Sequence, residues 1–348
     1  MKNNFRYLCI VLTSIYFSIF FTLCSKNPDD TEKIIEVEND ITSNTLWTSD
    51  NTYLITKNDL QVNATLTIEA GTTIKLNYSG YVTVNNKGKI IAQGTDNNPI
   101  IFTSNKDNEK WGSITLRESD GSEFIHCHFL YGGEPYGTAP TATIDLTSSS
   151  TAKIDNCIFA NNGGGTYNDN YVGVLNAQNA GTNTIITNNT FYANQLPMTI
   201  NSCINIDKSN IFSKGNEKNK YNGIFVSGMN ITQDTKWEED EVAFVLTNLT
   251  TSISYNTILT LGDNVVLKFR QGKNVVLNLD SESSIKNYDG NSVFFTSYLD
   301  DTRKGDTNGD GSASSPNDSD WGGIFIEKTN AFANWSNIKY NDPSATVK

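Results

Sequence analysis

The sequence predicts an all-β solenoid, in which short strands stack in successive coils along one axis. Asn, Thr, Ser and β-branched residues are abundant while the 348 residues contain only 7 prolines, which is typical of many short strands joined by turns. One such strand cannot bury its apolar face alone, whereas stacked coils build a continuous core. A pattern of the form apolar-x-polar-x-x-Phe recurs about every thirty residues, at Phe124–Phe129, Ile154–Phe159 and Ile186–Phe191.

Residues 1–23 have the features of a lipoprotein signal peptide. Lys2 and Arg6 precede an apolar run that ends at Leu23, and a polar, acidic segment follows Cys24. A basic start and an apolar core without a basic stop-transfer flank favour a signal peptide over an uncleaved anchor, which is the alternative. Cys24 lies where a lipoprotein is acylated after cleavage, although Leu23 replaces the usual small residue before it. We therefore expect an exported protein, held by lipid at the outer membrane or cell surface and not spanning the membrane.

Residues 24–43 are predicted to form an acidic, flexible tether, because they carry Asp, Glu and Thr with few large apolar groups. The formal net charge of the chain is -12 and its pI is about 4.7. A basic surface that follows phosphates is therefore not expected, and nucleic acid is excluded as a partner. Cations and neutral sugars are favoured as ligands.

An internal repeat divides the rest of the chain. Five blocks recur in the same order, and chance similarity does not easily preserve five blocks in register. The paired blocks are Trp47 with Trp237, Leu66–Leu76 with Leu259–Phe269, Pro99–Ser104 with Ser292–Ser297, Trp111–Ile114 with Trp321–Ile324, and Leu130–Tyr131 with Lys339–Tyr340. The sequence thus predicts two units of one architecture, residues 44–233 and a shorter unit at 234–348.

Three blocks of the first unit carry a family resemblance. Ile90–Thr95, Pro99–Ser104 and Trp111–Ile114 resemble the right-handed parallel β-helix repeats of bacterial surface proteins within the pectate-lyase-like superfamily. The resemblance covers residues 44–348 and implies a right-handed parallel β-helix. It does not imply an activity, because this scaffold carries lyases, hydrolases, adhesins and passive stalks.

The second unit contains an insertion at residues 298–320 that the first unit lacks. An Asp-x-Asn-x-Asp-Gly run starting at Asp306 reproduces the alternating oxygen ligands and the sharp turn of an EF-hand-type calcium loop, although Asn317 replaces the bidentate Glu. We predict a calcium site; a solvated acidic turn is the alternative. The candidate ligands are Asp306, Asn308, Asp310 and the backbone carbonyl of Ser312, with Asp300, Asp301, Asp318 or Asp320 completing the shell if the loop folds back.

Equivalent places in the three Phe-ending segments are taken by His126, Asn156 and Asn188. We expect the asparagines to stack at one turn position, where amide side chains can form a hydrogen-bonded ladder along the axis. His126 and His128 fall on one face of a predicted strand and could hold a metal with a nearby acid, but turn or surface positions are the simpler interpretation.

The cysteines of the first unit are predicted to be buried thiols. Cys127 and Cys157 align in neighbouring coils, and Cys203 lies in a later one. Stacked parallel strands rarely offer the geometry of a disulfide, so a Cys127–Cys157 bridge is the alternative.

No catalytic and no cofactor-binding residues are assigned. A polysaccharide lyase needs a base next to a neutralised carboxylate, and a glycoside hydrolase needs paired acids; neither arrangement is legible. Lys75 and Lys268 recur at equivalent repeat positions and, like Arg117 and Arg270, sit in or beside strands. This indicates outward-facing scaffold positions; a lyase base among them is the alternative.

Together these features predict a non-catalytic, surface-anchored β-helix lipoprotein that acts as a binding, adhesion or structural module. Its expected partners are the membrane, through acylated Cys24, and a polysaccharide or other host or cell-surface ligand. Exposed aromatic residues could stack on sugars; the candidates are Tyr131, Tyr136, Tyr167, Tyr171 and Trp335. A polysaccharide lyase or other carbohydrate-active enzyme is the alternative function.

Overall fold

The structure is a computed structural model that describes residues 33–85, 87–342 and 344. The predicted signal peptide, Cys24 and the first part of the predicted tether lie outside the described residues. Among the described residues, no helix has the length and apolar character needed to cross a membrane.

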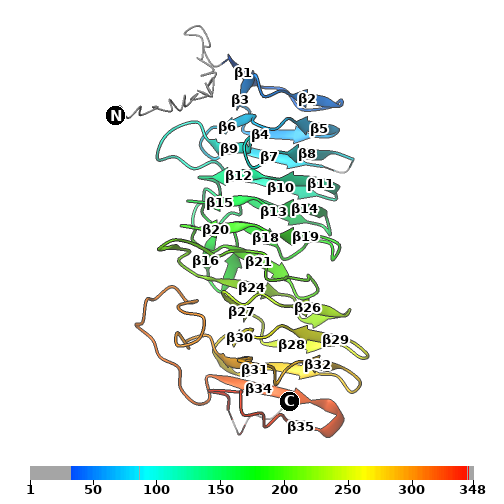
Figure 1. Cartoon of the computed structure of the whole chain (residues 1–348), viewed down its shortest axis with the longest axis vertical. Helices are drawn as coiled ribbons and strands as arrows, with labels where there is room; N and C mark the ends of the chain where they lie inside the picture. The colour runs from blue at the N-terminus through cyan, green and yellow to red at the C-terminus, as the bar shows by residue number, and fades with distance from the viewer. Residues whose placement is uncertain (1–32, 86, 343, 345–348) are drawn as a thin grey trace, which may run out of the picture. The chain divides into compact units, whose positions relative to one another are not determined.

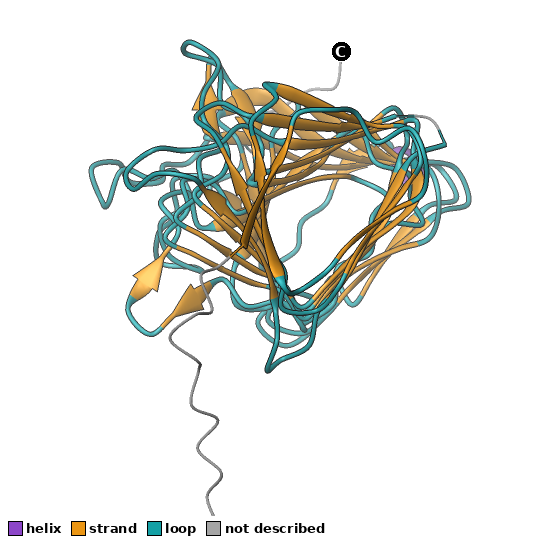
Figure 2. Ribbon diagram, turned by 90° about the horizontal axis from the view of Figure 1, so that it is seen from above, coloured by secondary structure: helices purple, strands orange, loops and turns teal. Residues whose placement is uncertain are grey.

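The chain folds as a right-handed parallel β-helix, which confirms the predicted fold class (Figure 1). Viewed from one end, the strands form the sides of the coils and the loops lie at the corners (Figure 2). One ten-stranded sheet runs through most of the stack: β4 (Asp59–Val62), β7 (Tyr81–Val84), β10 (Ile114–Arg117), β13 (Ile144–Thr147), β18 (Leu175–Ala177), β21 (Met198–Asn201), β24 (Gly223–Ser227), β27 (Ala243–Leu246), β30 (Val266–Phe269) and β33 (Phe294–Ser297).

Two further sheets complete the coils of the N-terminal part. The seven-stranded sheet contains β1 (Lys33–Val37), β3 (Asn51–Ile55), β6 (Thr73–Leu76), β9 (Ile100–Ser104), β12 (Cys127–Leu130), β15 (Ile158–Ala160) and β20 (Thr190–Tyr192). The six-stranded sheet contains β2 (Thr45–Trp47), β5 (Thr65–Ile68), β8 (Lys89–Gln93), β11 (Asp120–Ile125), β14 (Thr151–Asp155) and β19 (Ile185–Thr187).

Different sheets complete the coils of the C-terminal part. The five-stranded sheet contains β25 (Asn230–Ile231), β28 (Thr250–Ile253), β31 (Gly272–Leu279), β34 (Trp321–Ile326) and β35 (Ala331–Phe332), and the three-stranded sheet contains β26 (Thr235–Trp237), β29 (Ile258–Leu261) and β32 (Ser284–Lys286). The remaining elements are the hairpins β16 (Gly165–Tyr167) with β17 (Asn170–Val172) and β22 (Ser213–Lys214) with β23 (Glu217–Lys218), and the 3-10 helix η1 (Glu327–Thr329). The named strand pairs are parallel except these two hairpins and β34 with β35.

The core is built from side chains that stack along the axis. In the ten-stranded sheet, one inward position per coil is apolar and buried throughout: Leu60, Val82, Ile114, Ile144, Leu175, Met198, Ile224, Phe244, Leu267 and Phe295. A large apolar side chain contributes about 1.5–3 kcal/mol when fully buried. Because every coil adds to the same column, stability accumulates along the stack.

The Phe-ending segments stack in register as predicted, but each one contains a corner rather than a single strand. Phe129, Phe159 and Phe191 pair between neighbouring coils with ring centroids 4.8 Å apart at both steps. Between the six-stranded and seven-stranded sheets, His126, Asn156 and Asn188 adopt φ angles of 47°, 55° and 57°. Asn tolerates this left-handed conformation better than most residues, so it turns the chain between two sheets.

The expected amide ladder exists one residue further along than predicted. Asn188 donates its side-chain amide outward to Asp155, whereas the next residue, Asn189, is buried and donates to Asn210 Oδ1 at 3.1 Å. A second buried ladder joins Asn162 to Asn194 at 3.0 Å and Asn194 to Asn219 at 2.9 Å. The first Asn of the Asn188–Asn189 pair forms the corner, which leaves the second to point inward.

The two copies of a repeated block make similar contacts but lie on different sheets. The indole nitrogens of Trp111 and Trp321 both donate to a backbone carbonyl at 2.8 Å, that of Leu130 and that of Lys339. Lys75 pairs with Thr103 in the seven-stranded sheet, whereas Lys268 pairs with Thr296 in the ten-stranded sheet. The second copy is thus displaced around the axis by one sheet, and the predicted boundary at residues 233 and 234 lies between β25 and β26.

Candidate functional site

Two insertions cover part of the outer face of the ten-stranded sheet. The first leaves the stack after β15 and contains the hairpin β16–β17, and the second is the acidic loop at residues 298–320, between β33 and β34 (Figure 1). A Cβ at Gly163, where the first insertion departs, would lie 1.9 Å from the carbonyl oxygen of Gly133 in the coil before it. Only glycine permits this close approach, which explains the Gly-rich start of the insertion.

Both insertions pack on an outer apolar cluster, which consists of Leu196, Phe225 and Val245 with Tyr171, Tyr221 and Tyr298 against them. Phe225 stacks on Tyr171 of the hairpin with ring centroids 4.8 Å apart and meets Tyr298 of the loop edge-on at 6.2 Å. The hydroxyl groups of Tyr171 and Tyr298 are in contact, and the Tyr298 hydroxyl donates to the carbonyl of Thr307 in the loop at 3.3 Å. Burial raises the pKa of Tyr298 far above its ordinary range, so its hydroxyl stays protonated and serves as a donor.

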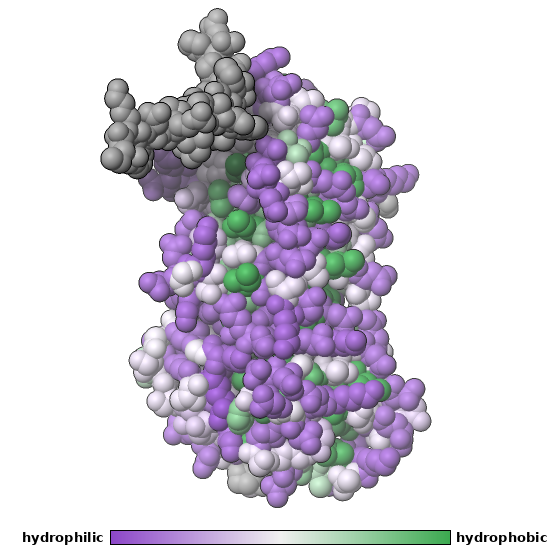
Figure 3. Space-filling view, viewed as in Figure 1, coloured by the Kyte–Doolittle hydropathy of each residue, from purple (hydrophilic) through white to green (hydrophobic). Residues whose placement is uncertain are grey.

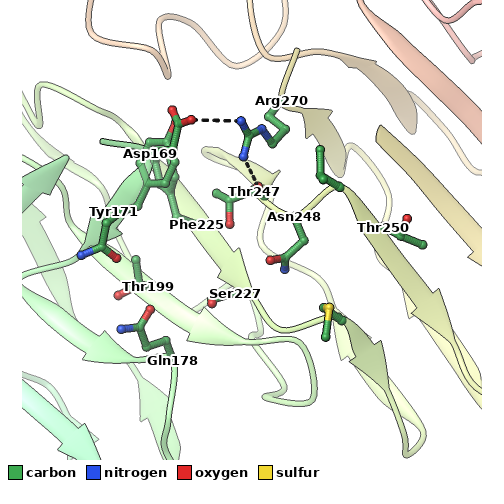
Figure 4. A pocket seen from close by; sticks show the side chains of 13 residues that line it. Asp169, Tyr171, Gln178, Thr199, Phe225, Ser227, Thr247, Asn248, Thr250 and Arg270 are labelled. Carbon is green, nitrogen blue, oxygen red and sulfur yellow. Dashed lines mark hydrogen bonds and ion pairs between the residues drawn. The ribbon is translucent and has the colours of Figure 1, made fainter. Parts of the chain in front are cut away.

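Beside this cluster lies a groove of about 430 Å³ (Figure 4). Tyr171 and Phe225 form its aromatic wall, Met229 and Leu249 its apolar rim, and Asp169 and Arg270 lie at one end. The rest of the lining consists of amide and hydroxyl side chains: Asn170, Gln178, Thr199, Ser227, Thr247, Asn248 and Thr250. Met229 and Leu249 expose 67% and 59% of their area. The face of the molecule seen in Figure 3 is mainly hydrophilic, with scattered apolar residues.

The two charged groups of the groove neutralise each other. Arg270 Nη2 lies 3.1 Å from Asp169 Oδ2 of the hairpin, and Nη1 donates to the carbonyl of Thr247 at 3.2 Å. The groove is therefore polar but close to neutral, which suits a ligand that offers hydroxyl groups rather than charges.

Lys268 departs from the prediction for outward basic residues. Its backbone position faces outward, like that of the half-buried Lys75, but the acidic loop covers it completely. Lys268 Nζ donates to the carbonyl of Gly305 at 2.7 Å and to Thr307 Oγ1 at 3.1 Å. Burial lowers its pKa to about 8, an effect that the loop carboxylates partly oppose.

The acidic loop brings three carboxylates together. Asp301, Asp306 and Asp310 each offer an oxygen, and these oxygens lie within 4.8 Å of one another. Both carboxylate oxygens of Asp301 are buried and have no hydrogen-bond partner. Burial, and next the neighbouring Asp306, raise the pKa of Asp301. Hydrogen bonds from Ser314 and from the loop backbone lower the pKa of Asp310. Such a trio has the oxygen chemistry that Ca²⁺ prefers.

The other predicted ligands have different surroundings, and of these Asn308 contacts the trio. Asp300 is buried and accepts hydrogen bonds from Thr296 and Thr302, and Asp320 accepts one from Ser297. Asp318 and Ser312 are exposed. Asn308 turns its amide nitrogen to Asp310 at 3.0 Å. Asp306 accepts hydrogen bonds from the backbone amides of Gly309 and Gly311, which gives the loop its tight turn.

The histidines and cysteines have structural surroundings. His126 Nδ1 lies 3.0 Å from Asp96 Oδ1 at a corner, and burial lowers the pKa of His128 on β12. Within the part of the chain that the structure describes, Asp301, Asp306 and Asp310 form the group of acidic, histidine or cysteine side chains that is close enough to share a metal. Neither histidine belongs to it. The cysteines expected as buried thiols, Cys127, Cys157 and Cys203, are buried and unbridged.

The candidate sugar-stacking residues differ in their exposure and packing. Tyr131, Tyr136 and Tyr167 are exposed. Tyr171 packs on Phe225, and Trp335 stacks on Tyr288 with ring centroids 4.0 Å apart. Of these residues, Tyr171 lines the groove.

Comparison with protein families identifies the architecture. Residues 39–119 match the family model described as the pectate-lyase-like β-helix domain. The chain carries a pectate-lyase-like β-helix domain. The match covers the coils from β2 to β10, so the groove and the acidic loop lie outside the matched part of this domain. Searches of curated proteins and of solved structures return no significant match.

Proposed function

We propose that this protein is a non-catalytic binding module of the cell surface, which holds an extended, neutral carbohydrate in the groove outside the ten-stranded sheet. The groove carries the proposal, because it combines hydroxyl and amide side chains with the ring of Tyr171, which is backed by the buried ring of Phe225. Sugars present hydroxyl groups at their edges and apolar C–H faces to aromatic rings. Adhesion to a glycan-coated surface is the corresponding biological role.

The coil repeat suits an extended ligand. Neighbouring strands are about 4.8 Å apart in a sheet. Ser227 and Thr247 directly follow the paired residues Val226 and Leu246 of neighbouring coils, so their hydroxyl groups recur along the groove at that spacing. A chain of sugar rings aligned with the axis would meet a similar partner at these two coils.

The alternative is a polysaccharide lyase, which needs a base and a bound cation facing the same reacting carbon. In the described groove the basic residue is Arg270, and its guanidinium is already paired with Asp169. Lys268, whose pKa of about 8 would suit a base, is covered by the loop. These observations favour binding over catalysis.

Affinity electrophoresis through gels that contain neutral or acidic polysaccharides tests the groove. We expect a neutral glycan to retard the mature chain, and Gln178→Ala to weaken retention about fivefold, the effect of one lost hydrogen bond of about 1 kcal/mol. Asn274→Ala, an exposed asparagine on β31, is the matched control and keeps full retention. Equal retention of both variants would place the ligand elsewhere.

We also propose that the acidic loop binds calcium through Asp301, Asp306 and Asp310. A cation would supply the partner that the buried oxygens of Asp301 lack. With three carboxylates and no bidentate Glu in the predicted place, we expect a dissociation constant on the order of 0.1–1 mM, typical of extracellular modules.

Calorimetric titration with calcium tests this site. Asp301→Asn should abolish binding, whereas Asp318→Asn, which neutralises an exposed acid of the same loop, should leave it unchanged. Loss of binding in both variants would indicate a diffuse effect of charge rather than a site.

The lipid anchor is proposed from the sequence. Acylation of Cys24 would tie the module to the outer membrane or cell surface, with a tether between membrane and β-helix. Metabolic labelling with an alkyne fatty acid should mark the wild-type chain and not Cys24→Ser. Label in the variant would refute the assignment of Cys24.

A further inference from the structure

The acidic loop and the groove share structural elements, although they are far apart in the sequence. Tyr298 opens the loop, and its hydroxyl contacts that of Tyr171, which lines the groove. The ring of Tyr298 also meets Phe225, the other aromatic residue of the groove wall, at 6.2 Å. A shift of the loop would therefore reach Tyr171, which a ligand would contact, and Phe225, which lies behind it.

A second connection runs through β30 and its outer face. Lys268 binds the loop through Gly305 and Thr307, and Arg270 lies just after the end of this strand. Arg270 holds Asp169 in the turn of the hairpin at 3.1 Å. The loop thus rests on the strand that leads into Arg270, while Tyr298 contacts Tyr171 on β17.

The carboxylates of the acidic loop destabilise the conformation that the loop adopts. Asp301, Asp306 and Asp310 place like charges within 4.8 Å, and the two Asp301 oxygens are buried without a donor. Like charges at this distance repel, and an unpaired buried carboxylate is costly. The cationic group packed beneath the loop, Lys268, uses its hydrogen bonds on Gly305 and Thr307 instead. A divalent cation would remove the repulsion between these carboxylates and give the Asp301 oxygens a partner.

We propose that cation binding by Asp301, Asp306 and Asp310 orders the hairpin β16–β17 and thereby controls access to the groove. This inference rests on the calcium site proposed above and extends it to regulation of the groove. The cation and the groove ligand would then raise each other's affinity, because coupling between two sites is reciprocal. At low calcium the hairpin loosens and the groove loses its aromatic wall.

Hydrogen–deuterium exchange of the full mature chain tests the coupling without any groove ligand. We compare millimolar calcium with chelator and follow peptides from the loop at 298–320 and from the hairpin at 165–172. Calcium should slow exchange in both, by about fivefold or more in the hairpin, the lower end of usual allosteric coupling. The hairpin contributes no residue to the carboxylate trio, so slower exchange in the hairpin shows that the effect of calcium is transmitted from the loop.

Three variants separate the steps. Asp301→Asn should remove the calcium effect from both segments, and Asp318→Asn should keep it in both. Tyr171→Phe retains the ring that stacks on Phe225 and leaves the hydrogen bond from Tyr298 to Thr307 of the loop in place, but it loses the hydroxyl contact with Tyr298. It should therefore keep protection of the loop and lose most of it in the hairpin. Protection confined to the loop in the wild type would refute the coupling while leaving the calcium site intact. No effect of calcium on either segment would refute both.

Discussion

Lys268 is a completely buried residue that can carry a charge, and its ionisation makes the stability of the fold depend on pH. Its pKa is about 8 in the folded chain, below the ordinary value of 10.5, because burial penalises the charged form. Between these two values the unfolded chain binds a proton that the folded chain has lost. The free energy of unfolding should therefore rise with pH from about 8 to about 10.5, by on the order of 1–3 kcal/mol.

Urea denaturation in chelator at pH 7.5 and pH 10 measures this rise. Lys268→Met, which keeps the aliphatic stem, should lack it, whereas Lys75→Met at the equivalent repeat position should retain it. The same pH dependence in the Lys268 variant would assign the effect to other groups.

The buried Glu239 should make the free energy of unfolding depend on pH with the opposite sign. Burial raises its pKa from 4.5 to about 7; one carboxylate oxygen accepts the backbone amides of Asp240 and Glu241, and the other is buried without a partner. Between pH 4.5 and 7 the folded chain binds more protons than the unfolded chain, so stability should fall as pH rises through this range. Glu239→Gln keeps the acceptor oxygen and should flatten the curve by on the order of 1–3 kcal/mol. An unchanged curve would contradict the assignment.

At this scale the sequence predicted residue types better than their surroundings. The recurrence of Lys75 as Lys268 correctly indicated an outward backbone position on the strand. Nothing in the local pattern revealed that the loop at 298–320 would fold back over Lys268, because that depends on contacts with residues far along the chain. For the same reason the sequence offered eight possible calcium ligands, and only the folded loop shows that carboxylate oxygens of Asp301, Asp306 and Asp310 lie close to one another.

Among the structural elements, the buried asparagine ladders should contribute most per residue. Asn194 donates to the carbonyl of Phe159 and to Asn219, and accepts from Asn162. Asn194→Ala would leave buried groups in neighbouring coils without partners, at a cost of about 2–4 kcal/mol. Asn179→Ala, at an exposed position of the neighbouring coil segment, should cost less than about 0.5 kcal/mol. Chemical denaturation measures both; similar losses would contradict the ladder's role.

Strands and corners follow from local sequence, whereas the function of the insertions does not. The alternation of apolar residues predicts stacked coils, and the ladder was displaced by one residue because the αL corner takes Asn188 rather than Asn189. The longer connection at 298–320 was visible by comparing the two repeats. The hairpin β16–β17 was missed, although the Gly163–Gly165 run was a signal that the chain leaves the stack there.

For the whole molecule, the repeat predicts the architecture because each coil is matched to its neighbours by the same inward column. The groove could not be predicted in this way. Its walls combine strands of several coils with the first insertion, and its support comes from the second insertion. Periodicity therefore determines the scaffold, and the departures from periodicity create the candidate site.

One measurement tests most directly whether this scaffold binds without catalysis. The mature chain is incubated in millimolar calcium with each of several neutral and acidic polysaccharides, and the bound protein and the absorbance of unsaturated uronides are recorded in the same sample. We predict that a neutral glycan retains the protein and that absorbance stays at the level of the protein-free control. Unsaturated products that accumulate in proportion to protein concentration would contradict the account and identify a lyase.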